Sequence, residues 1–545
     1  MKNPSRLSLP LLFIFLVASV AHAARVERLI DTWQPKNYLV TISLNDQLSE
    51  IEYANVRIDV LILKPTNLID LDFGDLTIDK VTLDTKTVEF THRDGKLNIN
   101  LPQRSQPGTV HAVTVQYHGK PKDGLILTND KDGKPSAIGD NWPNRVHHWI
   151  PTLDHPSAKA TVTFDVNAPA NYTVVANGRM EYVTTSGRRF WHYVENAPIP
   201  PYCMIIAVGQ FKTIQPAERS LTPLLYYVPQ SDAPSALKGF GPANPSVSFF
   251  SETIAPYPYE KLALIVGATQ FGGMENSGAI VFSRTLFDPR PQARLSKTYG
   301  VPVGITSLIA HEIAHQWFGD SVTESTWADL WLSEGFATYF AGLFLQKHES
   351  EEAFQRYMSD AAAAAFAYEK QKRTPIVDRD TENLMELLNA NNYQKGAWVL
   401  HMLRSSMGDE VFFRALRSYY QAHMNGTANS EDLRAALEKA SGRNLRTFFT
   451  RWIYDTGHPQ YELSWQWLRD RELRLVLRQT QPGNVFTDPV PVTISTASGA
   501  RDLVFKPTGK ATTETIQLRE KPLKIEVDPR NTLLKESRIS PAFPS

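Results

Sequence analysis

The stretch His311-Glu312-Ile313-Ala314-His315 decides the fold of this chain, together with Trp331-Leu332-Ser333-Glu334-Gly335 further on. On an α-helix of about 3.6 residues per turn, His311 and His315 lie on one face about one turn apart, so both imidazoles can reach a single cation. Glu312 lies roughly 100° round the helix, where it can contact a water on that cation without binding the cation itself. This pattern is typical of a hydrolytic zinc site.

The alternative for the pentapeptide alone is a surface helix with two solvated imidazoles. The neighbouring residues Leu308, Ile309 and Trp317 make this stretch mostly apolar. Burying two unpartnered imidazoles among such residues would be costly, and a bound metal removes that cost. The surroundings therefore favour a metal site.

Glu334 follows His315 after eighteen intervening residues and offers a third ligand from a second apolar stretch, for which Ser333 is a candidate N-cap. Three protein ligands and one water form the open coordination of a catalytic zinc site, whereas structural sites are closed by four ligands, usually including Cys. The chain has one Cys, so a closed thiolate site is excluded. We expect one Zn²⁺ per chain.

The composition narrows the class of protein. Lys and Arg number 57, Asp and Glu also number 57, and no long basic block occurs, which argues against a nucleic-acid partner. A chain of 545 residues is too long for one hydrophobic core and predicts several domains. Cys203 is the only thiol, so no intrachain disulfide can form.

Residues 1–23 match the three zones of a cleavable secretory signal. Two basic residues occur within the first six, the run 9–20 is mostly apolar, and Ala21-His22-Ala23 resembles a cleavage site. The alternative is a membrane anchor, but the run is short for a span of roughly 20 residues and contains Pro10. We expect export to the periplasm or the medium, without stable membrane insertion after cleavage.

Hydrophobic periodicity predicts an α+β multidomain chain. Apolar residues alternate with period two through 24–212, as at Val56, Ile58 and Val60, which predicts an N-terminal β domain. Residues 458–545 alternate again and predict a small C-terminal β-sandwich.

Between them, 213–457 is mainly helical from Ser307 onward. The predicted helices are 307–319, 334–347, 351–369, 381–404, 409–424, 430–440 and 444–455. The Ala-rich run 361–365 is expected to extend a helix, since Ala is the best helix former.

Two further segments carry functional side chains. Phe271-Gly272-Gly273-Met274-Glu275-Asn276-Ser277-Gly278 follows the apolar strand 262–266, and its paired glycines let the backbone approach a ligand closely. A strand edge there could pair with an extended peptide, although the segment in isolation favours an ordinary glycine turn with a solvated Glu. Tyr393-Gln394-Lys395-Gly396 precedes a helical stretch, where a lone Tyr is more often a packing residue.

In combination, these motifs closely resemble the gluzincin zinc aminopeptidases, the family of aminopeptidase N and the leukotriene-epoxide hydrolase. The resemblance extends to Asn196-Ala197-Pro198-Ile199-Pro200 and to Ala255-Pro256-Tyr257-Pro258-Tyr259-Glu260-Lys261, and it covers roughly residues 30 to 535. It implies a thermolysin-like catalytic domain over 213–457. It also implies removal of N-terminal residues from peptides by attack of a zinc-activated water on the first peptide bond.

The resemblance also implies roles for single residues. His311, His315 and Glu334 match the zinc ligands, Glu312 matches the general base and Tyr393 matches the group that stabilises the oxyanion. The chemistry agrees, because a carboxylate can carry the proton from water to the leaving amine and a phenol can donate to an oxyanion without adding charge.

Glu275 matches the residue that binds the free amine of the substrate, within a substrate-binding segment formed by Gly272, Gly273, Met274, Glu275 and Asn276. An α-ammonium with a pKa of about 7.7 to 8 pairs well with a carboxylate in a desolvated pocket. Anchoring that ammonium one residue from the metal restricts cleavage to the first bond. The expected partners are therefore peptides with a free N-terminus.

Some positions depart from the family pattern. The slot of a second amine-binding Gln or Glu falls near Trp142, where Asp140 or Asn141 could substitute only after a backbone shift. Ser333 replaces the usual Asn before the third ligand. Met385 stands where the epoxide hydrolase uses an Asp, which disfavours lipid-epoxide chemistry.

Two alternatives to an aminopeptidase remain: a zinc endopeptidase with the same metal machinery, and a non-catalytic peptide-binding protein. Nothing in the sequence favours one oligomeric state or one preferred first side chain.

Overall fold

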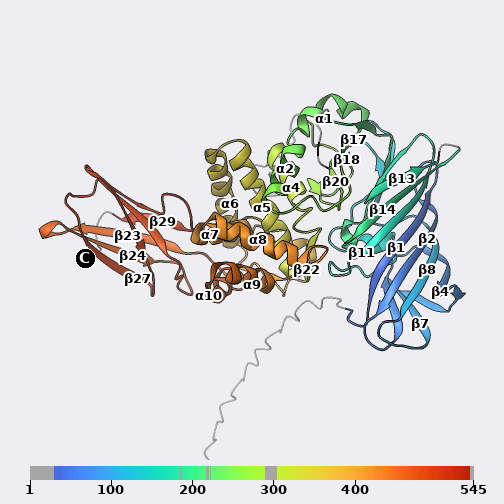
Figure 1. The fold of residues 1–545 in the computed structure, drawn as a ribbon, viewed down its shortest axis with the longest axis horizontal. Helices are drawn as coiled ribbons and strands as arrows, with labels where there is room; N and C mark the ends of the chain where they lie inside the picture. Colours follow the sequence, from blue (N-terminus) through green and yellow to red (C-terminus); the bar gives the residue numbers. More distant parts are fainter. Residues whose placement is uncertain (1–29, 185–186, 217–219, 221, 289–303, 541–545) are drawn as a thin grey trace, which may run out of the picture.

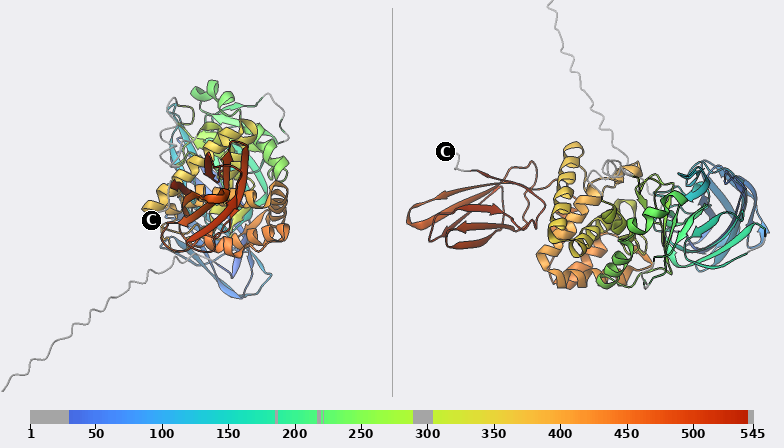
Figure 2. Two further views of the ribbon diagram at one scale, coloured as in Figure 1. Left: turned by 90° about the vertical axis from the view of Figure 1, so that its left-hand side faces the viewer. Right: turned by 90° about the horizontal axis from the view of Figure 1, so that it is seen from above.

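Three parts of the chain stand in a row in the computed structural model, which describes residues 30–184, 187–216, 220, 222–288 and 304–540. β-sheets form both ends and helices fill the middle (Figures 1 and 2). The predicted α+β multidomain class is confirmed. The predicted signal peptide 1–23 lies outside the described residues. No helix of the described residues has the length and apolar character needed to cross a membrane.

The N-terminal part is built on an eight-stranded sheet whose strands alternate buried and exposed residues, as their period-two patterns predict. In spatial order its strands are β13 (Arg179–Val183), β14 (Arg189–Ile199), β11 (Ala160–Ala168), β1 (Trp33–Leu44), β2 (Ile51–Ile62), β8 (Val110–Gly119), β4 (Thr77–Leu83) and β5 (Lys86–Thr87). Alternate residues of β2, including Val56, Ile58 and Val60, are fully buried in the core.

Two smaller sheets complete this part. One contains β3 (Thr66–Asp72), β7 (Lys96–Ser105) and β6 (Phe90–Arg93). The other contains β12 (Thr173–Ala176), β15 (Ile206–Gly209), β10 (Pro135–Gly139) and β9 (Leu125–Asn129).

A five-stranded sheet begins the middle part. Its order is β16 (Lys212–Ile214), β17 (Leu224–Val228), β18 (Leu262–Gly267), β20 (Ala279–Ser283) and β19 (Gly273–Met274). The central three strands are parallel, and β19 is an edge strand antiparallel to β20. The glycine-rich segment therefore forms the sheet edge that its sequence suggested. The domain boundary predicted between 212 and 213 falls within β16, and the domain limits stay predictions.

The helices of the middle part pack around one apolar core. They are α1 (Ala233–Gly239), α2 (Ala243–Thr253), α4 (Ile305–Ala314), α5 (Trp331–His348), α6 (Glu351–Gln371), α7 (Gly396–Met407), α8 (Asp409–His423), α9 (Ser430–Ser441) and α10 (Arg446–Trp452). The short strands β21 (Val322–Glu324) and β22 (Gly426–Ala428) pair in parallel beside them. The Ala-rich run 361–365 lies within α6, as predicted.

The predicted helix 381–404 is wrong over its first half. A 3₁₀ turn (Leu384–Leu387) and a π-helix (Asn391–Lys395) precede α7. The cause is an asparagine-rich stretch whose amides compete with helical hydrogen bonds. Asn389 Oδ1 accepts from the backbone N–H of Asn391 at 2.9 Å, and Asn392 Nδ2 donates to Leu387 O at 2.8 Å.

The expected N-cap at Ser333 is also wrong. Helix α5 begins at Trp331, directly after a 3₁₀ turn (Trp327–Asp329), and its N-cap residue Leu330 already has helical dihedral angles. Ser333 is thus inside the first turn, where its hydroxyl contacts His315 instead.

The C-terminal part is the predicted sandwich of two small sheets. One contains β27 (Ala511–Gln517), β24 (Glu472–Gln479), β23 (Gln460–Trp467) and β29 (Glu536–Ser540), and the other β26 (Gly499–Phe505), β25 (Val490–Thr496) and β28 (Lys524–Val527). His458 joins this part to α6, because its ring nitrogens lie 2.9 Å from Glu369 Oε2 and 3.3 Å from Glu536 Oε2.

Two lysines, the half-buried Lys159 and the buried Lys261, join the N-terminal and middle parts. Lys159 Nζ donates to the carbonyls of Asp320 and Ser321 at 2.8 and 2.7 Å. Lys261 Nζ donates to Ala176 O at 2.8 Å and to Gly278 O at 3.0 Å. The two ammonium groups thus donate hydrogen bonds to backbone oxygens that lose contact with water where the N-terminal and middle parts meet.

A pair of carboxyl groups occupies the same joint. Glu195 on β14 is buried, and the carboxyl of Glu260 in the middle part is close enough for its charge to act on Glu195. Burial raises the pKa of Glu195 to about 8, and the neighbouring charge of Glu260 adds to the effect. A proton on Glu195 therefore stabilises the contact between the two parts, because it leaves this buried carboxyl uncharged.

The pair predicts a pH-dependent stability. Between the ordinary pKa of 4.5 and about 8, the folded chain keeps a proton on Glu195 that the unfolded chain has lost, so the free energy of unfolding falls as pH rises through this window. In Glu195→Gln, the amide that replaces the carboxyl stays uncharged at every pH. We expect its Tm to exceed that of the wild type at pH 8.5 and to match it at pH 5 in calorimetry.

Glu514→Gln on exposed β27 is the matched control, for which no such difference is expected. An equal effect of Glu195→Gln at both pH values would contradict a proton held on Glu195.

Candidate metal centre and active-site cavity

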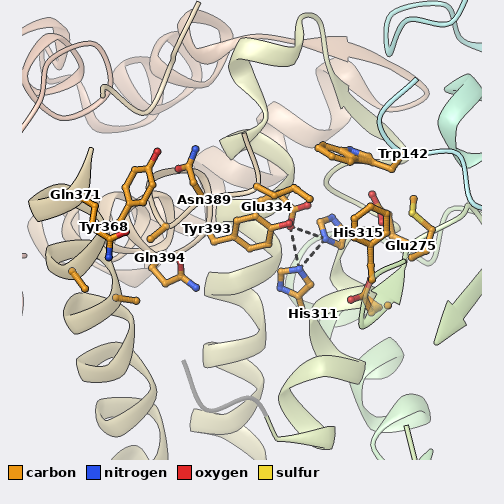
Figure 3. Close-up of a pocket in the computed structure, with 18 residues that line it drawn as sticks. Trp142, Glu275, His311, His315, Glu334, Tyr368, Gln371, Asn389, Tyr393 and Gln394 are labelled. Atoms are coloured by element: carbon orange, nitrogen blue, oxygen red, sulfur yellow. Dashed lines mark hydrogen bonds and ion pairs between the residues drawn. The ribbon is translucent and has the colours of Figure 1, made fainter. Parts of the chain in front are cut away.

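Three buried side chains converge at one point between α4 and α5. Among the described residues, His311, His315 and Glu334 are the one group of His, Cys, Asp or Glu whose geometry could hold a metal ion. His311 Nε2 lies 3.0 Å from His315 Nε2 and 3.2 Å from Glu334 Oε2, and His315 Nε2 lies 3.3 Å from the same oxygen (Figure 3). The three predicted ligands are therefore brought together.

This donor set fits zinc. Ligands of tetrahedral Zn²⁺, bound at about 2.0–2.2 Å, lie roughly 3.3 Å from one another. The three donor atoms have nearly this spacing, and two imidazoles with one carboxylate leave a fourth position for water. His311, His315 and Glu334 would hold the ion.

His315 is oriented by contacts on the far side of its ring. Its Nδ1 lies 3.2 Å from Phe318 O and 3.0 Å from Ser333 Oγ. Since a carbonyl oxygen can only accept, Nδ1 carries a proton, and Nε2 is the nitrogen that would bind the metal. Ser333, where the family usually has Asn, thus contacts a ligand.

The electrostatics of Glu334 suit a ligand as well. Burial alone would raise the pKa of this carboxyl, but the attraction of His315 and hydrogen bonds from both imidazoles outweigh it and lower the pKa to about 2. Glu334 is therefore ionised and ready to bind a cation.

Glu312 lies beside the three ligands, against β19. A Cβ added to Gly273 would lie 2.3 Å from the carboxyl carbon of Glu312, so only glycine lets the edge strand approach this side chain. Burial raises the pKa of Glu312 well above its ordinary value. A carboxyl group with this property takes up protons readily.

Tyr393 is carried to the cluster by the π-helix. Its ring stacks on that of His311, with centroids 6.0 Å apart and planes 4° from parallel. A Cβ on Gly335 would meet Gly396 Cα at 3.0 Å, so two glycines allow α5 to approach the start of α7. This close approach sets the position of Tyr393 relative to Glu334.

Glu275 lines the same cavity of about 490 Å³ as the three ligands, Glu312 and Tyr393. It follows the edge strand β19, and burial raises its pKa to about 7. Gly273 and Met274 also line the cavity, whereas Gly272 and Asn276 are not among the lining residues. The side-chain amide of Asn276 donates to Met274 O at 3.3 Å and so supports the segment from behind.

The cavity has a second wall that the motifs did not indicate. In Figure 3, Tyr368 and Gln371 stand on one side of the metal-binding cluster, and Trp142 and Glu275 stand on the other. Further lining residues are Phe271, Ala364, Ala367, Leu388, Asn389, Ala390 and Gln394. Positions 364, 367, 368 and 371 have the spacing of one face of a helix, so a single face of α6 lines the cavity. The sequence shows this spacing but not that the face lies beside the metal-binding residues.

The second amine contact suggested near Trp142 is wrong for both candidates. Asp140 is fully buried and binds Arg145 Nη2 at 3.0 Å, while Asn141 donates to Met204 O and accepts from Trp149 Nε1. Neither side chain lines the cavity. Trp142 itself does, with its indole packed edge-on against Phe271.

Removing the metal should destabilise the chain. Zinc bound to the folded state at about 100 times its Kd contributes about 2.7 kcal/mol, so a chelator should lower the Tm measurably. We expect about one zinc per chain by mass spectrometry, and loss of this zinc in His315→Ala. His423→Ala, at the end of α8 and outside the cluster, should keep it. Full zinc content in His315→Ala would contradict the site.

Comparison with known families agrees with this arrangement. The Peptidase M1 N-terminal domain matches residues 34–203, and the Peptidase family M1 domain matches residues 242–452. The chain is 27% identical to tricorn protease-interacting factor F2 of Thermoplasma acidophilum, over 80% of this chain and 56% of the relative.

Two plant proteins are similarly related. The chain is 26% identical to aminopeptidase M1 of Arabidopsis thaliana, over 78% of this chain and 50% of the relative. It is 28% identical to aminopeptidase M1-A of Oryza sativa subsp. japonica, over 72% and 45%. The chain thus spans about half the length of the curated relatives it matches.

The resemblance to the gluzincin aminopeptidases is confirmed by these matches. Since two domains of one family match in succession, one on the N-terminal sheets and one on the helices that carry the metal-binding cluster, the chain belongs to peptidase family M1.

Proposed function

We propose that this chain is a zinc aminopeptidase that removes N-terminal residues from peptides. One observation carries the proposal: the carboxyl of Glu275 shares a single cavity with the metal-binding cluster. An amine held at Glu275 would place the first peptide bond beside the metal. The names of two relatives, aminopeptidase M1 and aminopeptidase M1-A, support the same activity.

Substrate binding follows from the sheet edge. Because β19 is an edge strand, an extended peptide can lie beside it with main-chain hydrogen bonds. The substrate's ammonium then pairs with the Glu275 carboxylate in a desolvated pocket, where a charge-assisted hydrogen bond is strong. A free N-terminus is thereby required.

When bound by His311, His315 and Glu334, a zinc ion supplies Lewis acidity toward water and the scissile carbonyl. Glu312 takes the proton from the attacking water and passes it to the leaving amine. The phenol of Tyr393 donates a hydrogen bond to the oxyanion that develops on the carbonyl oxygen.

The second candidate is a zinc endopeptidase, which would use the same cluster without the amine contact. The buried position of Glu275 in the cavity favours the aminopeptidase, because an internal segment of a peptide brings no cation to pair with this carboxylate.

Peptide and aminoacyl-anilide hydrolysis tests the proposal. The zinc-loaded chain should cleave substrates with a free amine and leave their N-acetylated forms intact. In Glu275→Gln we expect kcat/KM to fall about 10- to 100-fold, the worth of a charged hydrogen bond of about 1.5–3 kcal/mol.

Glu324→Gln is the matched control, because this carboxyl is equally buried but does not line the cavity. Cleavage of acetylated peptides at the free-amine rate would favour the endopeptidase. Absence of cleavage in the zinc-loaded chain would favour the non-catalytic peptide-binding protein.

We also propose that the chain acts after export, on the strength of the signal-like residues 1–23. The mature protein recovered from the periplasm or the medium should begin at Ala24, as determined by mass spectrometry of its N-terminal peptide. A cytoplasmic protein that retains Met1 would refute export.

A further inference from the structure

Gln316 follows the second ligand, His315, and is fully buried between α4 and the Glu275 segment. Its Nε2 donates to Glu275 O at 2.7 Å and to Asp320 Oδ2 at 2.9 Å. Its Oε1 accepts from the backbone N–H of Gly278 at 2.8 Å and from the Tyr257 hydroxyl at 2.9 Å. The amide therefore uses both of its donor hydrogens and both of its acceptor sites.

Two of these four bonds hold the segment 275–278 at both of its ends. Two other carbonyls of this segment are bound by side chains from elsewhere: Asn177 Nδ2 donates to Ser277 O at 2.8 Å, and Lys261 Nζ donates to Gly278 O at 3.0 Å. Asn177 belongs to the N-terminal part, and Lys261 directly precedes β18. The two bonds of Gln316, by contrast, connect the residue next to the ligand His315 directly to segment 275–278.

We propose that Gln316 is a positioning residue that fixes the separation between the metal ligands and the Glu275 carboxylate, and thereby selects which peptide bond is cleaved. This inference rests on the proposed aminopeptidase function. An extended peptide advances about 3.3–3.6 Å per residue, so the cut stays at the first bond only while that separation is held to a fraction of this length.

The hydrogen bonds of Gln316 to segment 275–278 should also affect the rate of cleavage. A misplacement of about 1 Å between reacting groups can cost about 100-fold in rate. A segment released from Gln316 would keep the ligands and Glu275 intact but lose their fixed spacing. The expected defect is therefore in kcat and in the cleaved bond, with the metal retained.

A buried amide with several hydrogen bonds also stabilises the fold, so a matched control is needed. Gln479 in the C-terminal sandwich is buried, donates to Phe486 O at 2.7 Å, and accepts from Phe486 N at 2.9 Å and from Gln481 Nε2 at 2.8 Å. It holds one segment as Gln316 does, but the Phe486 that it binds is not among the residues that line the cavity, whereas the Glu275 bound by Gln316 is. Gln479→Met therefore reports the purely structural cost.

The experiment compares Gln316→Met, Gln316→Glu and Gln479→Met in the full zinc-loaded chain. For each variant, zinc content, Tm, kcat and KM on an aminoacyl-anilide are measured, together with the products of a decapeptide by mass spectrometry. We expect Gln316→Met to keep about one zinc, to lose about 100-fold in kcat per zinc, and to release N-terminal dipeptide besides single residues. Gln479→Met should lower the Tm and leave kcat and products unchanged.

Gln316→Glu keeps the length of the side chain and its acceptor side, so the bond from the backbone N–H of Gly278 can remain. Its kcat should lie between those of the wild type and Gln316→Met. This variant carries the test if Gln316→Met does not fold.

Unchanged kcat per zinc and unchanged products in the Gln316 variants, with an active wild type, would overturn the positioning role alone. Activity lost in proportion to zinc would also overturn it, because Gln316 would then merely support the ligands. A zinc-loaded wild type that cleaves no free-amine substrate would refute the proposed function, and this inference with it.

Discussion

Four carboxyl groups, those of Glu275, Glu312, Asp320 and Glu334, are buried around one short stretch of chain, and this concentration of negative charge is the constraint on which the rest of the structure depends. Charges removed from water are tolerated when they are paired, hydrogen-bonded or neutralised by protonation. These carboxyls meet the condition in different ways. Glu334 is ionised against two imidazoles, whereas burial raises the pKa values of Glu275 and Glu312.

The divalent cation that this site fits would offset part of that charge. Its ligands come from the end of α4 and the start of α5, so the ion would join the two helices at the centre of the core. Binding and folding are therefore linked here, and the catalytic cluster also contributes to the stability of the middle part.

Much of the fold could be predicted because its signals are local. Period-two alternation indicated strands such as β2 and β24, and helical periods indicated α6 and α8. The strand signal failed at Leu523, which continues the alternation of Ile525 and Val527 but lies exposed just before β28. The pattern of residue types along the sequence does not show at which residue the backbone hydrogen bonds of a strand begin.

The candidate site was predictable where its residues fall within motifs, and less so where tertiary contacts decide. The sequence shows that positions 273 and 335 are glycines. Only the fold shows why, since Gly273 lies against Glu312 and Gly335 lies against Gly396. The family resemblance put a second amine contact near Trp142 and left Asp140 as a substitute, whereas Arg145 and the backbone N–H of Gln270 already bind that carboxylate. Competition for a side chain by its three-dimensional neighbours is invisible in sequence.

Helix α6 connects two features that lie far apart in the row of domains. One face carries Tyr368 and Gln371 into the cavity, and Glu369 on the same turn binds His458 at the base of the C-terminal sandwich. The sandwich therefore braces a wall of the reaction chamber from outside. Deleting the C-terminal sandwich would therefore remove a support of the α6 wall of the cavity, although none of its residues belongs to the motifs that identify the site.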